Sequence, residues 1–230
     1  MSKISIICSN YNSDRWIDDY LNYLNEQIDR RFAVIFIDAN STDESLSKIK
    51  KFSSSTDIEV KILECKERIG IYAAWNLGIK SAETEYVMNY NTDDMLYRYA
   101  ISVYNSYVDK HPEIDLFYGP CGFVKTRNIS DYTSYINWPE YSHEIMMHMC
   151  IGGPFPLLKK KVFEEIGYFD ESFVSSGDYE MWARMSKQKR SFKKIPEAIG
   201  SFYLREDSVH SSNAEKARQE DQFIQTKYKI

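Results

Sequence analysis

ISIICSNYNS, residues 4–13, is the stretch that decides the fold. Ile4 to Cys8 is an apolar run of the length of a buried strand, and the polar cluster that follows it is typical of a loop. Apolar residues then recur at spacings of three and four from Trp16 to Ile28, which predicts a helix with one apolar face. A second apolar run, Ala33 to Ile37, predicts the next strand. The chain therefore begins with a β-α-β unit.

The same alternation continues along the chain. Ser41-Thr42-Asp43-Glu44 has the S-x-x-E form of a capping box, so we expect a helix that begins there and runs to Phe52. A strand is expected over 58–63, a helix over 70–82 and another strand over 86–90. The βαβαβαβ order predicts right-handed crossovers and a mostly parallel central sheet with helices on both faces.

After about residue 110 the alternation fades into segments that carry Tyr and Trp. Helices are expected near 159–166 and 178–187 and a strand near 193–203, and this half is expected to complete the edge of the sheet. A chain of 230 residues is long enough for one sizeable core and short for two, so we expect a single α/β domain over 1–230.

The composition excludes several classes of protein. With 43% hydrophobic and 27% charged residues it is that of an ordinary globular protein, and a net charge of −5 offers no basic face for nucleic acid. No apolar run approaches the ~20 residues that span a bilayer, and residues 1–3 lead directly into the first strand rather than into a signal peptide. We therefore expect no transmembrane segment and a cytoplasmic location.

The cysteines and histidines form no metal-site pattern. The four cysteines are far apart, without a C-x-x-C pair, and are expected to be buried free thiols. His143 and His148 lie in a segment similar to H-E-x-x-H, but their spacing of five turns them ~140° apart around a helix. A zinc protease is therefore not expected.

Polar residues follow three of the predicted strands at the point where each strand ends, in 9–13, 38–43 and 91–94. Ligands of parallel sheets bind beyond these carboxyl ends. No G-x-G-x-x-G follows the first strand and no P-loop motif occurs, so other residues must hold any phosphate. The adjacent Asp93 and Asp94 suit Mg²⁺ or Mn²⁺, which takes one or two carboxylates and completes its shell with substrate phosphates. The alternative is that one of them is the N-cap of a following helix.

Taken in order, these segments resemble the inverting family 2 glycosyltransferases of the GT-A fold. The resemblance covers nearly the whole chain and is carried by S-x-Y-N at 9–12, Asp38 with 40–43, and the segments 70–78, 91–94, 167–171 and 177–182, followed by Arg205, Ser208 and Ser211. It implies a GT-A type domain in which 1–110 binds a nucleotide sugar and 111–230 binds the acceptor.

The resemblance implies that Tyr11 and Asn12 line the nucleotide pocket and that Asp38 accepts a hydrogen bond from the base, usually uracil in this family. Asn76 and Gly78 would help to close the pocket beside the diphosphate. From the residues alone, Tyr11 in the core, Asp38 in a turn and Gly78 in helix packing remain the alternatives.

Asp93 matches the last acid of the family's D-x-D motif, which coordinates the divalent ion, Mn²⁺ or Mg²⁺. Asn91 replaces the first acid, whose position contacts the sugar or ribose, so it could donate a hydrogen bond but adds no charge. Arg205 belongs to a loop similar to the one that folds over the diphosphate, and its planar fork suits phosphate. His210, in the same loop, is implied as a further metal ligand or phosphate contact. A surface Arg and a solvated His are the alternatives.

Asp178 matches the family's catalytic base, with Gly177 in the place of the usual first acid. Displacing a nucleoside diphosphate requires neutralisation of the leaving group and removal of a proton from the attacking hydroxyl, and Asp178 would do the second. Asp178 could also be the N-cap of the helix that follows. Trp182, on the same helix face, would either pack in the core or present an apolar wall to the acceptor sugar.

The function implied is transfer of a sugar, with inversion, from a nucleotide-diphosphate sugar such as a UDP-sugar to a hydroxyl acceptor. Polysaccharide or glycoconjugate biosynthesis is the usual setting, the acceptor would be a glycan or lipid-linked, and any membrane contact would be peripheral. Because Asn91 and Gly177 stand where acids are usual, a non-catalytic nucleotide- or carbohydrate-binding module remains the alternative. An aromatic stretch could stack on sugars or form a packed lid, and consists of Tyr132, Tyr135, Trp138 and Tyr141.

Overall fold

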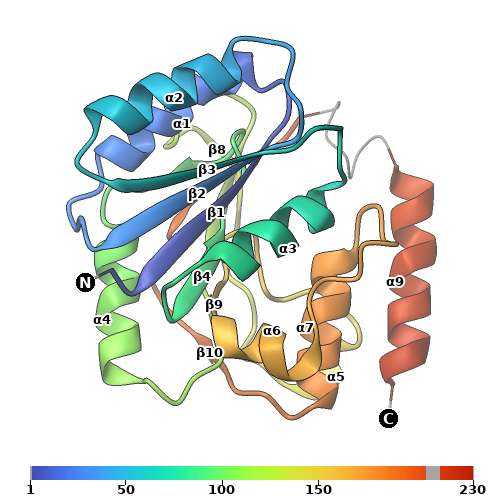
Figure 1. The fold of residues 1–230 in the computed structure, drawn as a ribbon. Coiled ribbons are helices and arrows are strands. Elements are labelled where there is room, and N and C mark those ends of the chain that lie inside the picture. The colour runs from blue at the N-terminus through green and yellow to red at the C-terminus, as the bar shows by residue number, and fades with distance from the viewer. Residues whose placement is uncertain (1, 206–212, 230) are drawn as a thin grey trace.

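A seven-stranded sheet forms the centre of the molecule in the computed structural model, which describes residues 2–205 and 213–229 (Figure 1). The strand order is β10-β6-β9-β4-β1-β2-β3. The strands are β1 (Ile4–Asn10), β2 (Phe32–Asp38), β3 (Glu59–Glu64), β4 (Tyr86–Asn89), β6 (Leu116–Tyr118), β9 (Leu157–Lys159) and β10 (Phe192–Lys194). Strands β1 to β4 pair in parallel, and β9 runs antiparallel to both of its neighbours. The expected mostly parallel sheet is confirmed.

Three helices connect the first four strands and cover both faces of the sheet (Figure 1). They are α1 (Asp14–Asn25), α2 (Ser45–Ser55) and α3 (Ile71–Ser81). Successive residues of β1 point to opposite faces, so Ile6 packs in the same cluster as Ile17 of α1, while Ile7 packs with Ile79 of α3. The two apolar clusters sandwich the sheet, and the βαβαβαβ prediction is confirmed.

The predicted capping box does not form, because the residues of 41–44 have other partners. Ser41 Oγ accepts a hydrogen bond from Asn12 N–H at 3.1 Å. Asp43 Oδ1 instead accepts from the backbone N–H of Ser45 at 3.0 Å. Helix α2 therefore begins at Ser45, four residues later than the capping-box prediction, which is wrong.

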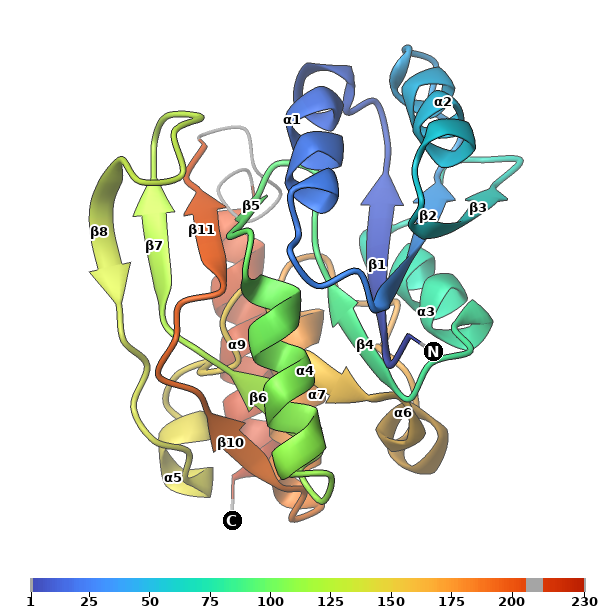
Figure 2. The same cartoon turned by 90° about the vertical axis from the view of Figure 1, so that its left-hand side faces the viewer.

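The second half of the chain adds to the large sheet and builds a smaller one. The four-stranded sheet has the order β5-β11-β7-β8, formed by β5 (Met95–Leu96), β11 (Gly200–Tyr203), β7 (Cys121–Val124) and β8 (Tyr132–Ile136). Figure 2 shows β8, β7 and β11 side by side. The strand expected near 193–203 is thus two strands, β10 and β11, that belong to different sheets.

The other helices within 2–205 and 213–229 are α4 (Ala100–Lys110), α5 (His143–Met146), α6 (Lys160–Ile166), α7 (Gly177–Lys187) and α9 (Ala214–Tyr228). Helices α7 and α9 pack in the same apolar cluster as α3, through Trp182, Ile224 and Tyr228 among others. Among the residues that the structure describes, no helix is long and apolar enough to cross a membrane.

Candidate functional site

The carboxyl ends of β1 and β2 hold a buried polar network. Asn10 and Asp38 are paired in the sheet register, and Asn10 Nδ2 donates to Asp38 Oδ1 at 2.7 Å. Asp38 Oδ2 accepts from the backbone N–H of Ser41 at 3.0 Å. Both carboxylate oxygens of Asp38 are therefore oriented by the protein, although each oxygen retains a further lone pair that a ligand could use.

The loop after β1 turns back over this network. Asn12 has a φ of 47°, a conformation that Asn tolerates better than most residues, and its Oδ1 accepts from Thr42 N–H at 2.8 Å. The Tyr11 side chain is 39% exposed, so the alternative that placed it in the core is wrong. The Arg68 guanidinium lies over its ring at 4.3 Å. Arg68 was not among the predicted site residues, although it follows β3 at the same edge of the sheet.

Asn76 lies apart from this network, and the prediction that it helps to close the pocket beside the diphosphate is wrong. Its Nδ2 donates to the Phe169 carbonyl and to Glu171 Oε1, both at 2.9 Å, and its Oδ1 accepts from Phe169 N–H at 3.0 Å. The side chain is buried and committed to the protein's own loop. It therefore fixes α3 against this loop instead of facing a diphosphate. Gly78 packs against β1 and β2, since an added Cβ would lie 2.5 Å from Ile7 and 2.7 Å from Ile37.

The loop after β4 brings Asp93 to Arg205. Arg205 Nε lies 2.8 Å from Asp93 Oδ2, and both side chains are mostly buried. The Asp93 carbonyl oxygen also accepts a hydrogen bond from Arg127 Nη1. The residue matched to the metal ligand and the residue matched to the diphosphate contact are thus an ion pair across two loops that are far apart in sequence.

The neighbouring Asp94 has a different place. It is fully buried, and its Oδ1 accepts from the backbone N–H of Tyr203 in β11 at 3.2 Å. Burial, and next to it the charge of Asp93, hold the pKa of Asp94 well above its usual range. Neither acid caps a helix, because β5 follows and α4 begins only at Ala100. The N-cap alternative is therefore wrong, and the Asp94 side chain ties the loop after β4 to β11 of the small sheet.

The residues of this loop fit a divalent ion that is shared with a phosphate ligand. Among the described residues, Asn91 Oδ1 is buried without a hydrogen-bond partner, which leaves a second oxygen near Asp93 in the sequence. No group of three or more His, Cys, Asp or Glu side chains in 2–205 and 213–229 could hold a metal by itself. His210 lies outside the described residues. One or two protein oxygens are what Mg²⁺ takes when substrate phosphates complete its shell.

Arginines gather around Trp16 beside this loop. Guanidinium carbons lie over the indole at 4.2 Å for Arg15, 5.2 Å for Arg127 and 5.8 Å for Arg205. Arg127 also forms an ion pair with Asp19 at 3.0 Å. No local sequence pattern predicts this cluster, because Arg15, Arg127 and Arg205 come from three separate parts of the chain. Its positive charge next to Asp93 suits an anionic ligand.

Asp178 lies in the first turn of α7. Ser176 is the N-cap of this helix, so the prediction of Asp178 as N-cap is wrong. Its half-buried carboxylate accepts at Oδ1 from the Tyr179 N–H at 2.8 Å. There is no room for a side chain at Gly177, because an added Cβ would lie 2.7–2.9 Å from ring atoms of Tyr72.

Trp182 is a core residue. It is 1% exposed and packs edge-on against Phe169 with ring centroids 6.0 Å apart. A Cβ at Gly152 would lie 2.5 Å from its Nε1, so backbone covers the indole closely. The prediction of an apolar wall for an acceptor sugar is therefore wrong, and the core alternative is confirmed. In the aromatic stretch, Tyr132 and Tyr135 are exposed on β8, whereas Tyr141 stacks on Phe192 at 4.2 Å.

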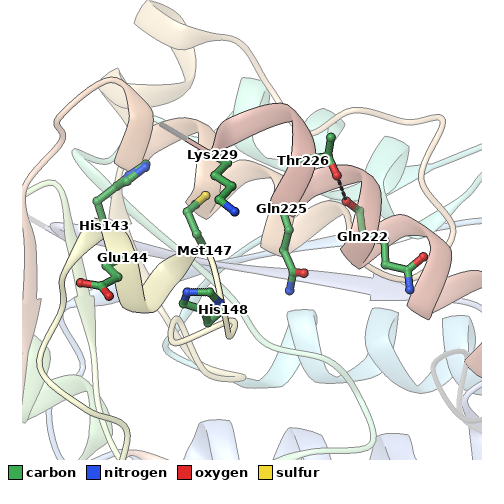
Figure 3. A pocket seen from close by; sticks show the side chains of 8 residues that line it. All are labelled: His143, Glu144, Met147, His148, Gln222, Gln225, Thr226 and Lys229. Atoms are coloured by element: carbon green, nitrogen blue, oxygen red, sulfur yellow. Dashed lines mark hydrogen bonds between the residues drawn. The ribbon is translucent and has the colours of Figure 1, made fainter.

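A cavity of about 890 Å³ lies elsewhere, between α5 and α9. Figure 3 shows the side chains around it, which are His143, Glu144, Met147, His148, Gln222, Gln225, Thr226 and Lys229. None of the residues expected to bind a nucleotide sugar lines it. This cavity and the polar strand ends are thus separate features.

Comparison with known sequences finds a matching family model and several relatives named as glycosyltransferases. Residues 5–167 match the family model described as Glycosyl transferase family 2. The poly(ribitol-phosphate) beta-N-acetylglucosaminyltransferase TarS of Staphylococcus aureus is 30% identical over 113 residues, which cover 48% of this chain and 20% of TarS. The minor teichoic acid biosynthesis protein GgaB of Bacillus subtilis is 23% identical over 223 residues, covering 93% of this chain and 24% of GgaB. The chain therefore spans only a small part of the length of these relatives.

Solved structures share the fold. The structure of S. aureus TarS 1–349 in complex with UDP-GlcNAc superposes with a TM-score of 0.75 at 22% identity, over 92% of this chain and 61% of that one. The mannosyltransferase PcManGT from Pyrobaculum calidifontis, in complex with GDP-Man and Mn²⁺, gives 0.72 at 18% identity, over 94% and 61%. Both are glycosyltransferases of the mixed α/β GT-A fold. Because the family model takes in 5–167 and the fold is shared, the chain belongs to glycosyl transferase family 2.

Proposed function

We propose that this chain transfers a sugar, with inversion, from a UDP-sugar to a hydroxyl of a glycan or lipid-linked acceptor, in cytoplasmic polysaccharide or glycoconjugate biosynthesis. The observation that carries the proposal is the contact of Asp93 with Arg205, at 2.8 Å. It joins the expected metal ligand to the expected diphosphate contact, beside a cluster of further arginines. The family membership and the TarS relative, named a beta-N-acetylglucosaminyltransferase, support the reaction class.

The nucleotide would lie over the ends of β1 and β2. There Asp38 offers a fixed carboxylate to a ring N–H, and Tyr11 offers an exposed aromatic face that Arg68 holds from one side. The complexes of TarS contain UDP or UDP-GlcNAc, whereas that of PcManGT contains GDP-Man. The choice of uracil is therefore part of the proposal, and its test has to include guanine nucleotides.

Asp93, with Asn91 near it in the sequence, would hold Mn²⁺ or Mg²⁺ together with the donor's diphosphate. When bound, such an ion supplies positive charge that neutralises the departing diphosphate. Arg205 would then exchange the Asp93 carboxylate for phosphate oxygens, to which a guanidinium can donate two parallel hydrogen bonds. Arg127 is held in place by Asp19 and the Asp93 carbonyl and adds to the positive field.

Asp178 would act as the general base. The acceptor hydroxyl oxygen attacks the anomeric carbon, the bond from that carbon to the diphosphate breaks, and the hydroxyl proton passes to the Asp178 carboxylate. The nucleoside diphosphate leaves with the electron pair of the broken bond, and a single displacement inverts the configuration. The hydrogen bond from Tyr179 N–H to Oδ1 orients the carboxylate at the start of α7, where it would accept the proton.

The test combines binding with turnover. Melting temperature is measured with UDP, GDP and their sugars, with Mn²⁺ or with EDTA, and release of nucleoside diphosphate is followed in the same samples. UDP or a UDP-sugar should stabilise the protein by about 2.7 kcal/mol at a hundredfold excess over Kd, and EDTA should weaken the effect. Stabilisation without any release would favour the non-catalytic binding module. Stabilisation by no nucleotide, or stabilisation indifferent to EDTA, would contradict the donor and metal assignments.

A further inference from the structure

Three consecutive backbone N–H groups just before α7 converge on one carboxylate. Val174 N–H donates to Glu220 Oε1 at 2.8 Å, and the N–H groups of Ser175 and Ser176 donate to Oε2, each at 2.9 Å. Ser176 is the N-cap of α7 but makes no side-chain capping hydrogen bond. Glu220 therefore supplies from another helix the acceptor that this helix start lacks locally.

The fourth N–H in the row is held from a different direction. Gly177 N–H donates to Tyr72 Oη of α3 at 2.8 Å, and the Tyr72 ring fills the space where a side chain at 177 would lie. Residues 174–177 thus have every backbone donor fixed by a side chain of a distant helix. Asp178 is the next residue, so its backbone position follows from these four bonds.

Glu220 is unusual for its position in α9. The buried face of this helix consists of Ala217, Glu220, Ile224 and Tyr228, so a carboxylate replaces an apolar residue in an otherwise apolar stripe. Figure 1 shows α9 alongside α7. Glu220 is 6% exposed. A buried carboxylate is costly unless it is fully hydrogen-bonded, and the three backbone N–H groups supply those bonds.

We propose that Glu220 is a positioning residue, whose carboxylate fixes the backbone of 174–176 and thereby sets the place of Asp178 at the start of α7. The proposal rests on the proposed role of Asp178 as the base. It makes α9 part of the acceptor side of the site, although α9 contributes no group to the reaction itself. Burial, and after it the charges of Asp178 and Glu220, raise the pKa of the Tyr72 hydroxyl, which itself accepts the Gly177 N–H.

The test uses Glu220→Gln, which keeps the shape of the side chain but replaces one acceptor oxygen by an NH₂ group that faces a backbone N–H. The readout is UDP release from UDP-GlcNAc, or from the nucleotide sugar that stabilises the parent most, with Mn²⁺ and with water as the hydroxyl that takes the sugar. We expect kcat to fall by about 10- to 100-fold, the cost of misplacing a reacting group by about 1 Å, with donor KM and UDP affinity unchanged. Because a negative charge near Asp178 is removed, the acidic limb of the pH–rate profile should move to lower pH.

Two further variants separate positioning from folding. Glu215→Gln changes the same residue type in the same helix, where Glu215 is exposed and paired only with Arg218 and Gln219 among the described residues, and it should behave as the parent. Glu220→Asp keeps the carboxylate but draws it back by one methylene, so its kcat should lie between those of parent and Glu220→Gln. If Glu220→Gln does not fold, the kcat of Glu220→Asp relative to the parent tests the positioning role.

The outcomes are distinguishable. If Asp178→Asn abolishes release while folded Glu220→Gln and Glu220→Asp release UDP at the parental rate with an unchanged pH profile, Glu220 is merely structural and the inference is overturned alone. If the parent releases no UDP, or if Asp178→Asn releases it normally, the proposed function fails and the inference fails with it. A loss of UDP affinity in Glu220→Gln equal to its loss of rate would also overturn positioning, because donor binding is not assigned to this loop.

Discussion

At the ends of β1 and β2 the polar side chains are held by neighbours in the sheet, whereas the loop before Asp178 is held by residues of two distant helices. Asn10 and Asp38 are register partners on adjacent strands. Glu220 and Tyr72 lie 44 and 105 residues away from Ser176 and Gly177, to which they bond. The first arrangement follows once the strands pair. The second exists only when α3, α7 and α9 have all packed.

We call the strand ends that hold Asn10 and Asp38, with the loop after β4, the donor side, and we call the start of α7 with residues 174–178 the base side. A substitution on the donor side should change nucleotide affinity, because the strands keep their register when one of these side chains is replaced. A substitution around 174–177 should act on the rate, since it moves Asp178 and leaves the strand ends in place.

Asp178→Asn should lower transfer or nucleotide release by at least about 100-fold, since a general base contributes ~10²–10⁴-fold to a rate. Asn retains an oxygen that can accept the Tyr179 N–H, so folding should survive. Melting temperature, UDP affinity and rate are to be measured on one purified sample. A rate close to that of the parent would end the assignment of Asp178 as the base.

Gly177→Ala should destabilise the protein by about 1–3 kcal/mol, the usual cost of overpacking, because the new Cβ would meet the Tyr72 ring at 2.7–2.9 Å. Rate should fall more than UDP affinity. Gly70→Ala is the matched control, since a Cβ there meets nothing within 4 Å. If Gly177→Ala lowered stability and rate no more than Gly70→Ala does, the tight contact with Tyr72 would have no functional consequence.

Asp93→Asn should weaken Mn²⁺-dependent UDP binding by at least about tenfold, which is ~1.4 kcal/mol, because it removes the charge proposed to hold the ion. In EDTA no ion is present and the substitution removes only one ion-pair partner of Arg205, so UDP binding should change much less there. Asn91→Asp adds a charge nearby and should leave binding intact or tighten it. Isothermal titration with and without Mn²⁺ checks both variants. Equal affinity of Asp93→Asn and the parent in Mn²⁺ would argue against Asp93 as a metal ligand.

Substitution of Asp29 tests the pH dependence of stability at a position outside both the donor side and the base side. Hydrogen bonds from Arg31, and a further one from Asn105, lower the pKa of Asp29 to about 2 despite partial burial. A lowered pKa stabilises the fold above the unfolded value near 4, and this stabilisation is lost as pH falls from about 4 to about 2. We expect this stabilisation to be about 1 kcal/mol, because Arg31 is largely exposed and solvent screens the ion pair.

Urea unfolding of the parent and of Asp29→Asn should therefore differ at pH 7, and the difference should shrink as pH falls below 4. UDP affinity and rate should be equal in the two proteins at pH 7. A change in rate would mean that the site is coupled to this distant pair and that the division between donor side and base side is too simple.

The sequence determined the first half of the fold and the edge of the sheet where ligands should lie. Apolar runs and helical spacing are local, and the carboxyl ends of parallel strands share one edge, so 9–13, 38–43 and 91–94 could be brought together without a structure. The local capping signal at Ser41 failed because Asn12, from another loop, binds that hydroxyl. Whether a short motif forms its expected hydrogen bonds therefore depends also on residues outside the motif.

Only the tertiary structure decided the functions of individual side chains. Asn76 and Trp182 matched family positions, but packing of the 167–171 loop on α3 and α7 buries both. The ion pair of Asp93 with Arg205 and the hold of Glu220 on the start of α7 join residues whose separation along the chain shows no period. A side-chain hydrogen bond requires its atoms within about 3 Å, and for distant residues that distance is set by how whole helices and sheets pack, which local pattern does not encode.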